Sequence, residues 1–114
     1  MKPPALAEVE AAVARLVEAL AVWGATKVIL HGSVARGDYS ASSDIDVIIV
    51  KDTPHRLPQR IADALDRCVE AALPLPVEPL VYTPAEFDRL VADENPLIVE
   101  ALRHGRVLLD QARA

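Results

Sequence analysis

Residues 30–50 read LHGSVARGDYSASSDIDVIIV, and this stretch decides the fold and the chemistry of the chain. It holds the dipeptide Gly32-Ser33, a spacer of ten residues, and then Asp44-Ile45-Asp46 at the head of an apolar run. Glycine lets the backbone come close to a phosphate, and paired carboxylates suit a divalent metal ion. Either half alone is common in proteins, but the two at this spacing indicate nucleotide chemistry.

Two runs rich in β-branched residues flank the Gly-Ser turn and predict a pair of buried strands. One covers residues 27–31 and ends at the glycine; the other covers residues 44–50 and is polar only at its start. Between them, Ser33 is expected to cap a helix of about one to two turns that Gly37 ends.

Apolar residues at helical spacing predict two longer amphipathic helices. The first covers residues 5–22 and stops at Gly24. The second covers residues 57–72 and is closed by Pro74 and Pro76.

A third strand is expected over residues 77–83. Pro79 inside it indicates an edge or bulged strand, because proline has no backbone donor. Residues 83–86 read TPAE, a capping box with proline at the first helical position, and they predict a helix that reaches about residue 92.

The C-terminal part predicts one more short helix between Asn95-Pro96 and Gly105. Residues 106–109 form either a last strand or a packed tail. The element order is therefore α-β-α-β-α-β-α-α-(β), which predicts an α/β sandwich with a small sheet.

Length and charge limit the class of protein. With 114 residues there is room for one domain, so residues 1–114 are expected to form a single one. The net charge of −5 lacks the basic footprint of proteins that grip long DNA or RNA. Charged residues interrupt the apolar stretch 5–23, which argues against a membrane span.

Cys68 has no second cysteine to pair with, which fits the reducing cytoplasm. Apolar residues make up 52% of the chain, a share that favours an exposed surface for a partner.

The chemistry of the central stretch follows from strand geometry. Asp44 and Asp46 lie two residues apart, so both carboxylates point to the same side of the sheet. Magnesium prefers hard oxygen ligands and needs only one or two carboxylates beside the phosphates of a nucleoside triphosphate. Two such ions, about 3.5 to 4 Å apart, would clamp the attacking and leaving oxygens of an in-line displacement.

The Gly-Ser turn would supply the matching phosphate site. A helix that begins at Ser33 presents free N–H groups, and the serine hydroxyl adds a further donor. Arg36, one turn further along, either meets a phosphate or pairs with a local carboxylate. His31 beside the turn either contacts a phosphate or is satisfied by the backbone.

Residues 30–37 and 43–50 together resemble the signature of the polymerase-beta-type nucleotidyltransferase superfamily, G-S-x10-D-x-D. The small size is similar to its minimal nucleotidyltransferase branch. The resemblance implies the nucleotidyltransferase fold, an α/β (α+β) architecture in which a small mixed β-sheet is flanked by helices.

The resemblance also implies roles for individual residues. Asp44 and Asp46 would bind the divalent metal and Gly32-Ser33 the triphosphate, while a third carboxylate on a following strand completes the metal site and acts as base. Glu78 best matches that third position. Aspartate is usual there, so a glutamate followed by Pro79 is a departure that puts turnover in question, and a surface glutamate on an edge strand is the alternative.

The function implied by the resemblance is transfer of a nucleoside monophosphate, AMP from ATP, to an acceptor hydroxyl with Mg²⁺ as cofactor. Larger relatives carry extra acceptor-binding domains for which 114 residues leave no room, so a protein acceptor is expected. Minimal members often pair with a small helical HEPN-domain ribonuclease toxin and act as its antitoxin, in some cases by adenylylating one of its tyrosines (AMPylation). Two alternatives stay open: a degenerate module that neutralises its partner by contact alone, and a homo-oligomeric enzyme that modifies a small molecule.

Overall fold

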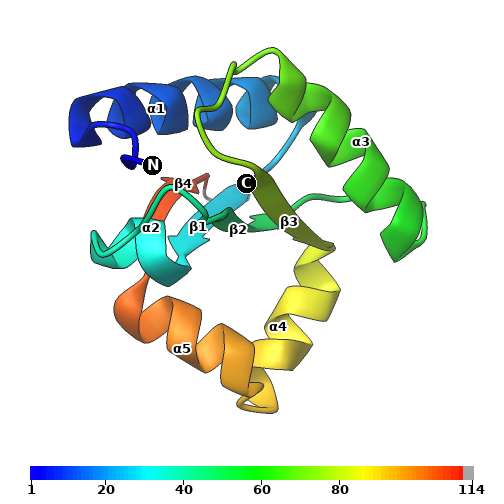
Figure 1. The fold of residues 1–114 in the computed structure, drawn as a ribbon. Helices are drawn as coiled ribbons and strands as arrows, with labels where there is room; N and C mark the ends of the chain where they lie inside the picture. The colour runs from blue at the N-terminus through cyan, green and yellow to red at the C-terminus, as the bar shows by residue number, and fades with distance from the viewer. Residues whose placement is uncertain (112–114) are drawn as a thin grey trace.

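The computed structural model describes residues 1–111 and has a four-stranded sheet at its centre (Figure 1). The strands are β1 (Lys27–His31), β2 (Ile45–Val50), β3 (Val77–Tyr82) and β4 (Arg106–Asp110), in the order β3-β2-β1-β4. β1 pairs antiparallel with β2 and β4, whereas β2 and β3 run parallel. The expectation of a small mixed sheet is confirmed, and the C-terminal segment is a strand.

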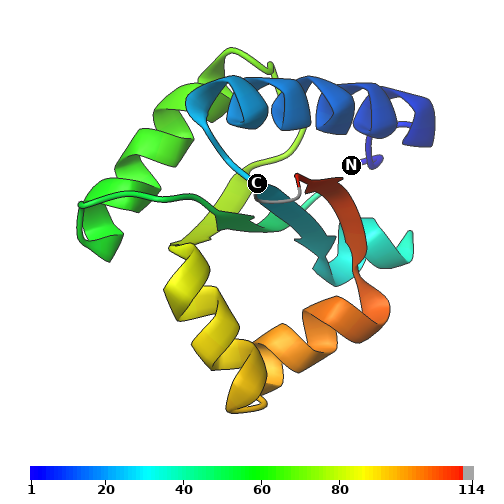
Figure 2. The same ribbon diagram turned by 180° about the vertical axis from the view of Figure 1, so that it is seen from behind.

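Helices cover both faces of this sheet (Figures 1 and 2). On one face lie α1 (Leu6–Trp23) and α3 (Leu57–Val69), and on the other lie α4 (Pro84–Ala92) and α5 (Pro96–His104). The short α2 (Gly32–Arg36) joins β1 to the loop before β2. The predicted element order is confirmed. None of the helices within residues 1–111 is long and apolar enough to cross a membrane.

Alternation along β2 decides on which face the acidic pair lies. Ile45, Val47 and Ile49 pack into the core cluster beneath α1 and α3, whereas Ile48 and Val50 belong to the cluster beneath α4 and α5. Because successive strand residues point to opposite faces, the Asp46 side chain points to the α4/α5 face. Asp46 thus continues the row of side chains formed by Ile48 and Val50, both of which are buried.

Two helix ends differ from the expectation. α2 begins at Gly32, whose φ of +75° makes the turn, so Ser33 lies inside the first turn and the prediction that it caps the helix is wrong. α3 ends at Val69 rather than at residue 72. Ala72 has a φ of +50°, and Arg15 of α1 donates to the carbonyls of Ala71 and Ala72 at 2.8 and 3.3 Å. The start of α2 and the end of α3 therefore depend on backbone conformation and contacts that the helical spacing of apolar residues does not reveal.

Pro79 lies on an edge strand, as its sequence indicates, and it does not disturb the pairing with β2. The carbonyls of Pro76 and Tyr82 accept hydrogen bonds from Ile45 and Lys51 of the β2 side, at 2.7 and 2.9 Å. Along a strand, the backbone N–H and C=O groups of successive residues point alternately to its two edges. The even-numbered residues of β3 therefore direct these groups at β2, and Pro79 directs its own toward the free edge. The missing donor is therefore on the free edge, and the register runs unbroken from Val77 to Tyr82.

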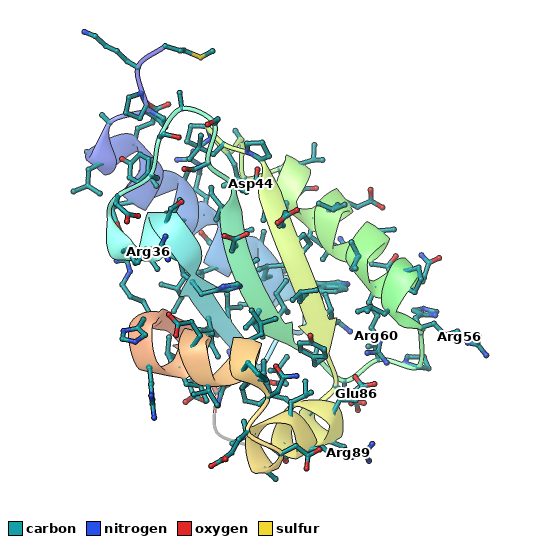
Figure 3. All side chains as sticks on the ribbon, turned by 60° about the horizontal axis from the view of Figure 1, so that its bottom comes forward. Arg36, Asp44, Arg56, Arg60, Glu86 and Arg89 are labelled. Atoms are coloured by element: carbon teal, nitrogen blue, oxygen red, sulfur yellow. The ribbon has the colours of Figure 1, made fainter. Side chains whose placement is uncertain are left out.

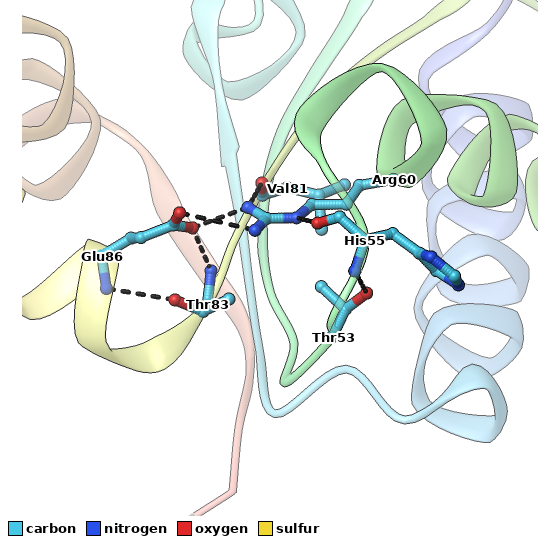
Figure 4. Close-up of polar contacts among 6 residues, drawn as sticks. All are labelled: Thr53, His55, Arg60, Val81, Thr83 and Glu86. Atoms are coloured by element: carbon cyan, nitrogen blue, oxygen red, sulfur yellow. Dashed lines mark hydrogen bonds and ion pairs between the residues drawn. The ribbon is translucent and has the colours of Figure 1, made fainter.

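A charged cluster ties α3, β3 and α4 together at one end of the sheet (Figure 4). Arg60 is only 9% exposed and donates through Nη1 to Glu86 Oε1 at 2.6 Å and to the Val81 carbonyl at 3.3 Å. Glu86 also accepts from the Thr83 amide at 2.8 Å, which completes the predicted capping box. Figure 3 shows that Arg60 and Glu86 lie at the opposite end of β3 from Asp44. The cluster is thus a structural anchor, remote from the acidic pair.

Candidate functional site

The sheet register brings three side chains together at the end of the strands near Asp44. Asp46 on β2 is paired with His31 on β1 and with Glu78 on β3. Registered residues on neighbouring strands point to the same face, and adjacent strands lie about 4.8 Å apart. Asp44 directly precedes β2 and shares this face by its two-residue offset from Asp46. The structure therefore aligns Glu78, Asp46 and His31 in one row across three strands.

Gly32 lies directly against the Asp46 carboxylate. A Cβ placed on Gly32 would overlap Asp46 Oδ2 and come within 3.3 Å of its Cγ. The residue also has a φ of +75°, a conformation that side chains with a Cβ rarely adopt. Glycine is required here for both reasons, and its presence puts the Gly-Ser turn in contact with the acidic pair.

The remaining residues of the expected phosphate site are placed less tightly. Ser33 is half-buried in the first turn of α2. Because α2 has only five residues, its dipole adds little, and the serine hydroxyl and the turn's N–H groups are the donors on offer. Arg36 pairs with Asp38 at 3.3 Å, and both side chains are exposed. Of its two expected arrangements, the structure has the local carboxylate pair.

His31 differs from a plain surface histidine because it is half-buried beside Asp46. Burial lowers the pKa of the imidazole below 6.5, although the neighbouring Asp46 carboxylate acts in the opposite direction. The ring is therefore neutral at pH 7. Residues 31 and 46 are distant in the sequence, so no spacing rule could have predicted that they are neighbours.

Tyr39 and Lys51, on either side of β2 in the sequence, both have partners away from the acidic pair. The Tyr39 hydroxyl donates to the Pro4 carbonyl at 2.9 Å, which holds the N-terminal segment against the loop before β2. Lys51 Nζ lies 5.0 Å from the centre of the Trp23 ring and donates to the Asp52 carbonyl. Because Lys51 directly follows β2, it lies at the far end of that strand from Asp46.

The side chains available as ligands are of the chemical type that a magnesium ion prefers. Asp44, Asp46 and Glu78 offer only carboxylate oxygens, the ligands that Mg²⁺ prefers, and one or two of them suffice when substrate phosphates supply the rest. Within residues 1–111, no group of three or more His, Cys, Asp or Glu side chains is close enough to hold an ion. The arrangement thus suits a carboxylate pair completed by phosphates better than a cage made by the protein alone.

Comparison with known proteins shows the family of the chain. The sequence profile of the nucleotidyltransferase domain family matches residues 12–108, which is most of the chain. Over 26 residues the chain is 65% identical to a protein of Methanocaldococcus jannaschii named as a putative protein adenylyltransferase. That segment spans 23% of this chain and 26% of the relative, so the match covers about a quarter of the relative's length.

One solved structure is also similar, a putative nucleotidyltransferase from Sulfolobus solfataricus. The two are 27% identical, with a TM-score of 0.48. The alignment covers 78% of this chain and 84% of the other.

Proposed function

Because the chain belongs to the nucleotidyltransferase domain family, we propose that it transfers AMP from ATP to a hydroxyl group of a partner protein with Mg²⁺ as cofactor. The observation that carries this proposal is the row of Asp46 and Glu78 against the Gly32 turn. The Asp46 carboxylate lies in direct contact with a turn suited to phosphate, and Glu78 is its neighbour on the adjacent strand. A nucleoside triphosphate with its metal ion needs both in one place.

Each residue of the row has a role in this proposal. Asp44 and Asp46, with Glu78, would hold the metal ion, which when bound neutralises charge on the phosphates. Gly32 and Ser33 bind the triphosphate through backbone N–H groups and the serine hydroxyl. A carboxylate oxygen of Glu78 accepts the proton of the acceptor hydroxyl, whose oxygen bonds to the α-phosphorus of ATP as the bond to the β-phosphate breaks and pyrophosphate leaves. Arg36 joins the phosphate site only if it leaves Asp38.

We also propose a specific setting for the reaction. The acceptor is a tyrosine of a small helical HEPN-domain toxin, and its adenylylation makes this chain an antitoxin in the cytoplasm. The short match to a relative named as a putative protein adenylyltransferase supports a protein acceptor. In this setting residues 1–114 act as one nucleotidyltransferase domain.

The second candidate is a module that neutralises its partner by contact alone. The observation that favours it is that residues 1–111 hold no ready group of three metal-ligating side chains. In that case the partner would bind equally well without ATP. A homo-oligomeric enzyme acting on a small molecule is the third candidate, and transfer to an aminoglycoside with no protein present would support it.

Labelled ATP distinguishes these candidates. The protein is incubated with α-³²P-ATP, Mg²⁺ and the product of the adjacent gene, and transfer of label to that product is measured. The proposal expects label with the wild type and none with Asp44→Ala. Absence of label with the wild type, together with unchanged neutralisation by Asp44→Ala, would establish contact alone.

A further inference from the structure

An apolar groove runs along the free edge of β3 beside α3. It consists of two adjoining cavities of about 370 Å³ each, which share Leu65 and Val77 as lining residues. Leu65 is 39% exposed and Val69, at the end of α3, is 77% exposed. All residues that line the groove are apolar except Glu78. The groove therefore follows the edge strand that carries Glu78, whose carboxylate points with Asp46 to the opposite face of the sheet.

We propose that this groove binds an amphipathic helix of the acceptor protein, with basic residues beside its apolar face, and so holds the acceptor at the edge strand that carries Glu78. The inference rests on the proposed function and names the surface that selects its substrate. A segment held against the free edge of β3 has that strand between itself and β2, so it lies two strand spacings, about 10 Å, from the strand of Asp46. An acceptor in the groove would thus approach the metal site past the edge strand that carries Glu78.

The edge of β3 excludes the other common way of binding a peptide. An added β-strand needs donors and acceptors along a free edge. Pro79 lacks the outward donor at the middle of β3, and the Val81 carbonyl already accepts from Arg60. Recognition therefore depends on side chains packed into the groove, which suits a helix face.

Charge selects among helical occupants. Asp66 on the outer side of α3 and Glu78 on β3 are exposed, and neither has an ion-pair partner within residues 1–111. A helix with Lys or Arg beside its apolar face complements this rim. A second copy of the chain would instead bring two acidic rims together in a protein of net charge −5. A small polar acceptor would find apolar residues along the groove, with Glu78 as the one charged residue at its edge.

Two synthetic helices test the groove without knowledge of the natural partner. Both have about 18 residues, or five turns, with the same leucine face and one tyrosine; one has lysine flanks and the other glutamate flanks. Binding to the full chain is measured by fluorescence anisotropy. We expect the lysine peptide to bind about tenfold or more tightly than the glutamate peptide, with the preference shrinking as salt is raised.

Two matched variants locate the binding surface. Val69→Lys should weaken binding of the lysine peptide about tenfold, because an apolar contact is lost and a like charge is added. Val22→Lys is the control: Val22 is 85% exposed near the end of α1, on the other flank of α3, and its variant should bind as the wild type does. Circular dichroism confirms that both variants fold.

Several results would overturn the inference. These are no binding of either peptide, no preference between them, or equal binding by the two variants. Sedimentation that shows a wild-type dimer which Val69→Lys dissociates would assign the groove to a second copy. Binding of MgATP is measured separately with the same proteins, so a failure of the metal-nucleotide site is distinguished from a failure of the groove.

Discussion

Replacing Gly32 by alanine tests whether the Gly-Ser turn and the acidic pair form one site. The added methyl group would occupy the place of Asp46 Oδ2, so the carboxylate must move away from the turn. Asp46 is short, and a change of its side-chain rotamer is enough to relieve the overlap. The fold should therefore survive while the site is distorted.

Gly37 provides a matched control for the backbone part of the effect. Its φ of +85° is close to that of Gly32, but a Cβ there meets nothing within 4 Å. In both variants the left-handed conformation costs about 1 to 2 kcal/mol, partly offset by about 0.5 to 1 kcal/mol from a stiffer unfolded chain. Gly37→Ala should thus lower the free energy of unfolding by about 1 kcal/mol, or the melting temperature by about 4 °C.

The difference between the two variants measures the contact with Asp46. Gly32→Ala should lose about a further 1 kcal/mol of stability, because the carboxylate is forced from its preferred rotamer. Its effect on the site should be much larger, since a misplacement of about 1 Å reduces catalysis by about a hundredfold. Urea unfolding gives the stabilities, transfer of label from α-³²P-ATP gives the rates, and calorimetric titration with MgATP gives the affinities.

The comparison of the two alanine variants can refute this reasoning. If Gly32→Ala binds MgATP as tightly as Gly37→Ala does, the contact between the turn and Asp46 has no part in nucleotide binding. If the two variants also lose equal stability, the overlap is relieved without cost. The site would then have to be sought elsewhere on the α4/α5 face.

Three further predictions concern single residues outside that contact. Burial raises the pKa of the Cys68 thiol to about 11, so Ellman's reagent at pH 8 should modify it only after unfolding; rapid modification of the native protein would contradict its burial. The hydrogen bond from Arg60, then that from the Thr83 amide, lowers the pKa of Glu86 below 4.5, so its contribution to stability is present above pH 4.5 and lost as the pH falls through the folded-state pKa. Glu86→Gln should accordingly make the free energy of unfolding depend less on pH in the acid range. An unchanged pH dependence would show that the Arg60–Glu86 pair is not its cause. Pro79→Val should change stability by less than about 1 kcal/mol, because the missing donor is on the free edge and the buried side chain stays apolar, but it should promote self-association by restoring that donor. Sedimentation velocity checks this, and a large loss of stability would show that Pro79 shapes the β2–β3 pairing.

Local signals in the chain predicted the order of elements well. Proline and glycine residues mark the ends of helices and strands. The capping box at Thr83 starts α4 as expected, and the run after Asp44 is a strand. Such signals act over a few residues, so they are visible in one sequence. They did not predict where α3 ends, because that end depends on Arg15 of another helix.

The sequence by itself determined that a Gly-Ser turn and an acidic pair belong to one nucleotidyltransferase domain, because residue type and spacing over 15 positions carry that information. Only the tertiary structure decided that Glu78 stands beside Asp46, that Pro79 turns its missing donor outward, and that an apolar groove passes beside Glu78. These facts follow from strand order and register. Both are decided by how buried side chains pack between α1, α3, α4 and α5, over distances that no local pattern in the chain records.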